Sequence, residues 1–213
     1  MSATEKFITD YEENRDDIEK WMSVKCEQKY RRFADLLKKN GIETTWINIT
    51  DLYRYDKRLL FNAFRYISFE EEYLRARAVR SSEDPENEYE KLQGKSLSGL
   101  IIELSSLGLI DSSEKKILDS VRKLRNAVSH NKILLEQKGI KGCFAALYRA
   151  LPVDYRGRFA EEIEKCRYGL EVSETFAIDV GHARTVISTA SPTMRPRRCA
   201  ALYQDSEKCN YVS

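Results

Sequence analysis

The sequence predicts an all-α protein, and two features of its composition carry that prediction. The 213-residue chain has only 9 Gly and 4 Pro, while 33% of its residues are charged and 42% are hydrophobic. Few helix breakers and many charges favour long amphipathic helices over a β-sandwich, which needs a turn about every 8–12 residues. The length favours one domain, with or without an appendage, and allows a core that needs no disulfide or metal for support.

Composition excludes several classes of protein. Lys and Arg number 36 against 34 Asp and Glu, so the net charge is +2 and nucleic-acid binding requires a local basic patch. No apolar stretch approaches the roughly 18 residues of a membrane span, and the acidic start of the chain lacks the apolar core of a secretory signal. The five cysteines form no C-x-x-C pair and histidines number two, so we expect a reducing cytoplasm, no metal and no cofactor.

The first half of the chain predicts two helical regions joined by a connector. Ser2 and Glu5 have capping-box spacing and start a region that ends near Asn40-Gly41. The segment 42–50 is rich in β-branched residues, which indicates a connector or a short extended piece. A second helix follows, with Thr50 and Asp51 as capping residues, and lasts to about residue 80.

The second half predicts further helices of a bundle. The polar segment 81–95 indicates an exposed loop, and 96–109 is apolar around most of its circumference, as in a helix buried mid-bundle. Capping-box spacing at Asp111 and Glu114 opens a helix over 112–136. Two more helices are expected, a short one after Gly139 and Gly142 that ends before Pro152, and one from Asp154 to Leu170.

These predicted elements divide the chain into three regions. Residues 1–49 form an N-terminal helical extension with its connector, and 50–170 form a bundle of four to five core helices. Residues 171–213 form an irregular tail that we expect to be loosely ordered, because apolar periodicity ends and Ser, Thr, Pro and Arg dominate from about residue 181.

The most informative segment lies late in the helix 112–136. A stripe of apolar residues at helical spacing faces the core of the bundle. Asn126 and His130, four residues apart, share the opposite face, and the long side chain of Arg125 reaches round to them. The core stripe consists of Ile117, Val121, Leu124, Val128 and Leu135.

The face that carries His130 also holds apolar residues. Ala127, Ile133 and Leu134 fall near it if the helix continues to residue 136. A helix with two apolar faces often has two packing partners, so this face predicts contact with a second subunit or another helix.

Each of these polar residues also has an ordinary interpretation. A single Arg is commonly an ion-paired surface residue, a single His is commonly structural, and Asn in a helix is commonly just solvated. Their concentration within six residues on the non-core face, in a chain with one other His, favours a functional site.

The string Arg125-Asn126-x-x-x-His130, late in a helix that follows an apolar helix, resembles the signature of the HEPN superfamily. The similarity is greatest to its Abi-like bacterial defence and toxin branch and covers residues 50–170. It implies a homodimer in which the two motifs face each other. Many members are metal-independent endoribonucleases acting on single-stranded RNA, and others bind RNA or protein without cutting.

One toxin subgroup carries a Tyr two residues after the His, which a nucleotidyltransferase antitoxin modifies. Lys132 occupies that position here, so the resemblance argues against such an antitoxin. An unidentified antitoxin of another kind, or a regulatory RNA, remains open as a partner.

The residue types suit RNA cleavage without a metal. The RNA 2′-hydroxyl is the nucleophile, a base removes its proton and an acid protonates the 5′-oxygen. Imidazole suits both proton transfers near neutral pH, and Arg donates two parallel hydrogen bonds to phosphate. His130 from each subunit of a symmetric dimer supplies base and acid. Asn126 hydrogen-bonds a phosphate oxygen or orients the imidazole.

A basic stripe on the helix 50–80 is a candidate RNA track. Three arginines and one phenylalanine gather opposite its core side, as a single-stranded backbone with a stacking base requires. An ordinary solvated helix face is the alternative. The predicted RNA contacts are Arg54, Arg58, Phe61, Arg65 and Lys132.

The sequence therefore supports three functions in order of preference. The first is a cytoplasmic homodimeric endoribonuclease of bacterial defence, an effector of abortive infection or a toxin. The second is a catalytically inactive bundle of the same kind that binds RNA or protein. The third is a purely structural helical interaction protein. None of them requires a membrane.

Overall fold

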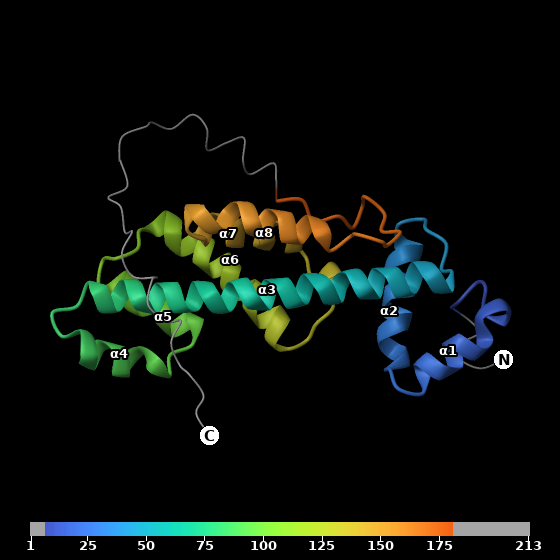
Figure 1. Cartoon of the computed structure of the whole chain (residues 1–213), viewed down its shortest axis with the longest axis horizontal. Coiled ribbons are helices and arrows are strands. Elements are labelled where there is room, and N and C mark those ends of the chain that lie inside the picture. The colour runs from blue at the N-terminus through green and yellow to red at the C-terminus, as the bar shows by residue number, and fades with distance from the viewer. Residues whose placement is uncertain (1–6, 181–213) are drawn as a thin grey trace, which may run out of the picture.

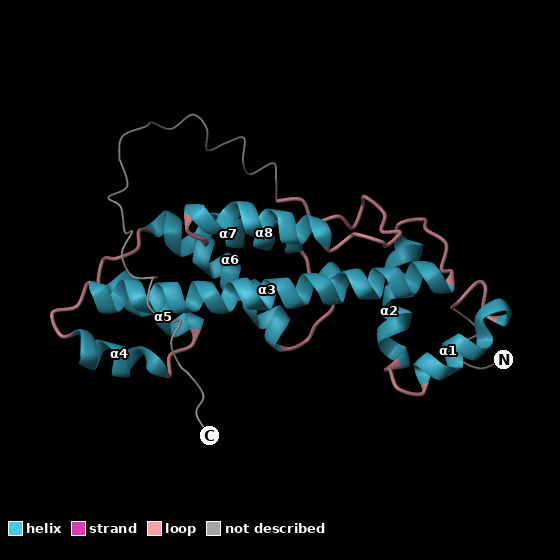
Figure 2. Cartoon of the chain, viewed as in Figure 1, coloured by secondary structure: helices cyan, strands magenta, loops and turns pink. Residues whose placement is uncertain are grey.

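The computed structural model describes residues 7–180, and every regular element in that range is helical, which confirms the all-α prediction (Figures 1 and 2). Within these residues no helix is both long enough and apolar enough to cross a bilayer. The α-helices are α1 (Arg15–Met22), α2 (Glu27–Lys39), α3 (Trp46–Arg80), α4 (Pro85–Gln93), α5 (Leu97–Ser106), α6 (Ser112–Ser129), α7 (Ile140–Ala150) and α8 (Val153–Lys165). Two short 3-10 helices, η1 (Glu12–Asn14) and η2 (Leu134–Glu136), complete the list.

The 35-residue α3 is the central element, and helices from both ends of the chain pack along it (Figure 1). It begins at Trp46, so the connector predicted over 42–50 is wrong from that residue onward. Thr45 caps the helix by accepting a hydrogen bond from the Asn48 amide at 3.3 Å. Trp46 and Ile49 are buried, and their burial outweighs the modest helix propensity of Trp and Ile.

The N-terminal region is interrupted and joins the main core. α1 and α2 replace the single predicted region, and α2 crosses α3 near its N-terminal end (Figure 1). The Tyr30 ring of α2 stacks on Tyr53 of α3, with the ring centroids 4.9 Å apart. Gly41 adopts a positive φ of 69° after α2, which confirms the end predicted at Asn40-Gly41. The capping box at Ser2 and Glu5 lies outside the described residues.

The segment 81–95, predicted to be a loop, contains α4. Asp84 caps this helix by accepting a hydrogen bond from the Asn87 amide at 3.3 Å. Pro85 occupies the first helical position, where its missing amide proton is not needed. Leu92 is fully buried and attaches the helix to the core. Pro85 therefore starts a helix here.

The helices of the second half follow the predicted order with shifted ends. Asp111 caps α6 as the sequence indicated. Ser96, which was not predicted as a cap, caps α5 by accepting from the Gly99 amide. α7 ends before Pro152 as predicted. α8 starts directly after Pro152 and ends at Lys165, five residues earlier than expected. Turns follow it up to Gly169, which has a φ of 72°.

α6 ends at Ser129, so the prediction of one helix to residue 136 is wrong. His130 is the C-cap, and Asn131 adopts the left-handed conformation with a φ of 48°. The amides of Asn131 and Lys132 donate to the carbonyls of Val128 and Ala127 at 2.9 and 3.0 Å. These bonds form a Schellman motif, which ends a helix sharply.

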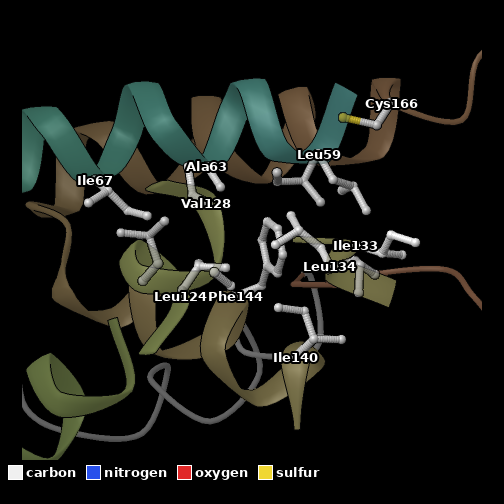
Figure 3. Close-up of a cluster of buried hydrophobic side chains, with 14 of the residues drawn as sticks. Leu59, Ala63, Ile67, Leu124, Val128, Ile133, Leu134, Ile140, Phe144 and Cys166 are labelled. Atoms are coloured by element: carbon white, nitrogen blue, oxygen red, sulfur yellow. The ribbon is translucent and has the colours of Figure 1, made fainter. Parts of the chain in front are cut away.

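The expected second apolar face of α6 is also wrong, because its residues are buried within the chain itself. Ile133 and Leu134 follow the end of the helix and turn inward toward Leu59 and Phe144 (Figure 3). Ala127 is buried as well. These three side chains are not available to a second subunit.

The expectation of a loosely ordered tail is wrong for residues 171–180, which pack on the bundle. The Ile178 amide donates to the buried Tyr55 hydroxyl at 2.8 Å, and the Glu171 amide donates to Asp51 Oδ2 at 2.9 Å. Phe176 is buried. The remainder of the predicted tail, from residue 181, lies outside the described residues.

Candidate functional site

The C-terminal half of α6 buries one face and exposes the polar motif on the other. Val121, Leu124 and Val128 are buried against the helices around α6, as the sequence predicted. Asn126 and His130 are exposed. Ile117 is half-buried, and Leu135, which belonged to the predicted stripe, lies beyond the helix in η2.

Arg125 lies at the edge between α6 and α3. Its side chain is 38% exposed, and its Nε is 3.4 Å from Glu71 Oε1 on α3. Glu71 Oε1 is buried and has no hydrogen-bond partner among the described residues. The contact with Arg125 is therefore an ion pair without a hydrogen bond. Glu71 also lies 3.9 Å from Arg75 through its other oxygen. The loose contact positions Arg125 while its Nη atoms make no further ion pair or hydrogen bond within residues 7–180.

His130 is fixed through its backbone. Its amide donates to the Asn126 carbonyl at 3.2 Å, and the left-handed Asn131 turns the chain away directly after it. Within the described part of the chain its imidazole makes no hydrogen bond or ion pair and is exposed. The arrangement therefore places a free imidazole at the tip of a rigid helix, which suits proton transfer to a bound molecule.

Two lysines that the sequence analysis did not single out meet at Asn131. Lys57 Nζ from α3 donates to Asn131 Oδ1 at 2.5 Å, and Lys29 Nζ from α2 donates to the Asn131 backbone oxygen at 3.3 Å. Burial and the neighbouring Lys29 lower the pKa of Lys57. Both lysines lie more than 70 positions before Asn131, so no local sequence pattern could have revealed the cluster.

Asp56 attaches the segment after the motif to α3. It is fully buried, and its Oδ1 accepts a hydrogen bond from the Leu135 amide at 3.1 Å. Burial raises the pKa of Asp56 to about 6, while the backbone hydrogen bonds and the charges of Lys29 and Lys57 act in the opposite direction. Asp56 therefore holds the turn that follows His130 in place.

The arginines of the predicted RNA track all have partners in the chain. Arg54 lies 3.3 Å from Asp51, and Arg58 donates to the carbonyls at the end of α8, including that of Tyr168 at 2.7 Å. Arg65 pairs with Glu162 of α8. Arg58 and Arg65 thus connect α3 to α8 and the turn after it. Their binding of RNA stays a prediction.

Lys132, the remaining predicted RNA contact, is exposed next to the turn at Asn131. Its backbone amide closes the Schellman motif, and its ammonium group makes no ion pair within residues 7–180. Its predicted role toward RNA is untested.

An exposed aromatic pair lies on α3 beside the motif. Phe61 and Phe64 are 67% and 56% exposed. On α3 they lie between Lys57, which contacts Asn131, and Glu71, which contacts Arg125. Their helical spacing places all four residues on one face of α3. Phe61 belongs to the predicted RNA track, whereas no sequence pattern pointed to Phe64.

No group of three or more His, Cys, Asp or Glu side chains within residues 7–180 has the geometry to hold a metal ion. Comparisons with protein families, with curated proteins and with solved structures found no match to this chain. The chemistry of the α6 terminus is therefore the basis on which a function can be argued.

Proposed function

We propose that this chain is a metal-independent endoribonuclease that cuts single-stranded RNA at a site composed from two copies, and that it acts as a bacterial defence effector or toxin. Residues 50–170 then correspond to the HEPN-like bundle. The observation that supports the proposal is the end of α6, where Arg125, Asn126 and His130 occur together outside the core. An exposed imidazole and a loosely paired guanidinium at the same end of α6 suit phosphoryl transfer better than a purely structural role.

The reaction follows from these groups. One imidazole takes the proton of the RNA 2′-hydroxyl as the 2′-oxygen forms a bond to phosphorus. The bond between phosphorus and the 5′-oxygen breaks, and the second imidazole gives its proton to that oxygen. Arg125 donates to the phosphate oxygens as negative charge grows in the transition state, and Asn126 holds the phosphate or the imidazole. The products are a 2′,3′-cyclic phosphate and a 5′-hydroxyl.

Two copies are required because each chain contributes one His130. A two-fold axis near the end of α6 brings the two imidazoles to one phosphate. The contact surface we propose contains Phe61 and Phe64, since these exposed rings border the motif and their removal from water is favourable. This surface replaces the one that Ile133 and Leu134 were expected to form.

Cleavage of a labelled single-stranded RNA in EDTA tests the proposal. We expect products with 2′,3′-cyclic phosphate ends, and we expect His130→Ala to abolish them. His182→Ala, at the only other histidine of the chain, is the matched control and retains activity. A strict requirement for added divalent metal, or equal activity of both variants, contradicts the proposal.

A second candidate is an RNA-binding or protein-binding module without catalysis. The ion pair between Arg125 and Glu71 favours it, because a paired guanidinium is less free to follow charge as it develops on phosphate. RNA binding by the wild-type protein without any cleavage selects this candidate. An antitoxin or a regulatory RNA remains an unassigned partner under either function.

A further inference from the structure

Two ammonium groups converge on one residue beside the candidate active site. Lys57 and Lys29, from different helices, donate to the side-chain and backbone oxygens of Asn131, which directly follows His130. Both oxygens are neutral acceptors. Neither lysine makes an ion pair with a carboxylate within residues 7–180, although 34 acidic residues are present in the chain.

We propose that Lys29 and Lys57 form a phosphate-binding subsite that holds the RNA backbone next to the scissile phosphate. The inference rests on the proposed function for its substrate, RNA, and adds a subsite that the motif does not contain. With a phosphate oxygen between the two ammonium groups, both donor and acceptor are charged, so these hydrogen bonds are stronger than those to the neutral oxygens of Asn131.

The electrostatic surroundings support an anion at this position. Burial and Lys29 both lower the pKa of Lys57, so the pair carries a mutual repulsion that an anion relieves. Asp56 is the nearby acid that interacts with both lysines, but it is buried and accepts a backbone hydrogen bond from Leu135. Its carboxylate therefore offsets the lysine charges from inside the core and leaves their outer side to a ligand.

The position of the pair also assigns a function to the N-terminal region. Lys29 belongs to α2, which lies outside the segment 50–170 that resembles the HEPN superfamily. α2 is attached rigidly, because Tyr30, the next residue, is buried and stacks on Tyr53 of α3. Packing of α2 on α3 thus builds a binding site from two parts of the chain.

RNA binding under a salt series tests the subsite. A fluorescein-labelled oligouridylate is titrated by anisotropy in the His130→Ala background, where the RNA stays intact. We expect Lys29→Gln with Lys57→Gln to weaken binding at least tenfold at low salt and to reduce the slope of log affinity against log salt by about 0.7–1.4, because each contact with a phosphate of a single strand contributes about 0.7. The matched control, Lys38→Gln with Lys39→Gln at the exposed end of α2, removes the same charge and leaves both values nearly unchanged.

A second variant separates binding from a structural role of the lysines. Asn131→Gly removes the side-chain acceptor of Lys57 and suits the positive φ at this position. If the lysines only tie the turn, this variant weakens RNA binding as the double lysine variant does. If they form the subsite, Asn131→Gly retains or strengthens RNA binding, because Lys57 is released.

Sodium pyrophosphate provides a probe that is independent of RNA cleavage. We expect it to raise the melting temperature of the wild-type protein and of the Lys38/Lys39 control, but not that of the Lys29/Lys57 variant. If the Lys29/Lys57 and Lys38/Lys39 variants show the same rise in melting temperature with pyrophosphate and the same salt dependence of RNA affinity, the subsite is wrong. The endoribonuclease proposal is unaffected by that result. Lysine-dependent binding by a wild-type protein that cuts no RNA supports the subsite and overturns the endoribonuclease proposal. A wild-type protein that binds neither probe overturns both.

Discussion

Among single residues, buried side chains that stabilise the fold differ from exposed side chains that can contact a substrate. Leu124 is buried, whereas its neighbours Asn126 and His130 point to solvent from the same helix. Glu70 is the opposite case, an acid enclosed by the core. The two kinds of residue predict different responses to substitution.

Substitution of His130 by Ala is expected to remove cleavage with little change in stability, because the imidazole makes no contact that its loss would leave unsatisfied. Arg125→Ala should behave similarly, since its ion pair with Glu71 is loose and partly exposed. Leu124→Ala is the control and should lower the free energy of unfolding by about 2–5 kcal/mol. Urea unfolding beside the cleavage assay checks this, and an unfolded His130→Ala protein would show that His130 is structural.

Glu70 predicts that stability falls as pH rises toward 8. Burial, and then the charge of Glu114, raise the pKa of Glu70 to about 8, whereas the unfolded chain has the ordinary value of 4.5. Between these values the folded protein keeps a proton that the unfolded chain releases, so increasing pH favours unfolding.

Glu70→Gln removes this titration. At pH 8.5 we expect the variant to be more stable than the wild-type protein by about 1–3 kcal/mol, since the charge buried without a partner is gone. At pH 4 the two proteins should differ little. Glu72→Gln on the exposed side of α3 is the control. Denaturant unfolding at both pH values checks the prediction, and equal pH profiles for the wild-type protein and Glu70→Gln would contradict it.

At the scale of elements, the end of α6 determines where the motif lies. The Schellman motif at Asn131 stops the helix directly after His130, and Asp56 holds the following turn. A helix continued to residue 136 would have kept His130 within a helix face and exposed Ile133 or Leu134. Termination instead buries both and leaves the imidazole at a helix tip.

The left-handed conformation of Asn131 predicts a clear order of substitutions. Asn131→Val should lower the free energy of unfolding by roughly 1–2 kcal/mol, because a β-branched side chain is strained at positive φ. Asn131→Gly should be close to neutral, since Gly adopts this conformation without strain. Thermal unfolding of both variants checks the order, and a Val variant as stable as the Gly variant would argue against the motif.

At the scale of the whole molecule, α3 connects the N-terminal helices, the motif and the proposed contact surface. On one face of α3, Lys57 contacts Asn131 and Glu71 contacts Arg125. The exposed Phe61 and Phe64 lie between these two contacts along the helix. Assembly and activity should therefore depend on the same surface.

Phe61→Ser with Phe64→Ser should convert a dimer to a monomer and abolish cleavage while the helical content is retained. Ile102→Ser on α5 is the control, because Ile102 is equally exposed but lies on another helix. Light scattering at micromolar concentration, with circular dichroism for folding, checks the outcome. A wild-type protein that is monomeric with and without RNA would contradict the proposed assembly.

The helical class, several helix ends and the core side of α6 could be predicted from the sequence alone. These depend on neighbouring residues, since Asp111 caps the helix that follows it and Val121, Leu124 and Val128 recur at helical spacing. Local chemistry also indicated that Asn126 and His130 lie outside the core.

The start of α3, the end of α6 and the partners of the charged side chains depend instead on how the helices pack. Trp46 is buried at the start of α3, and Ile133 is buried in the core after the end of α6. Arg58 binds the carbonyls at the end of α8, and Lys29 and Lys57 meet at Asn131, 102 and 74 positions away. Contacts between residues so far apart in the sequence arise from packing of whole helices, which no local pattern of residues encodes.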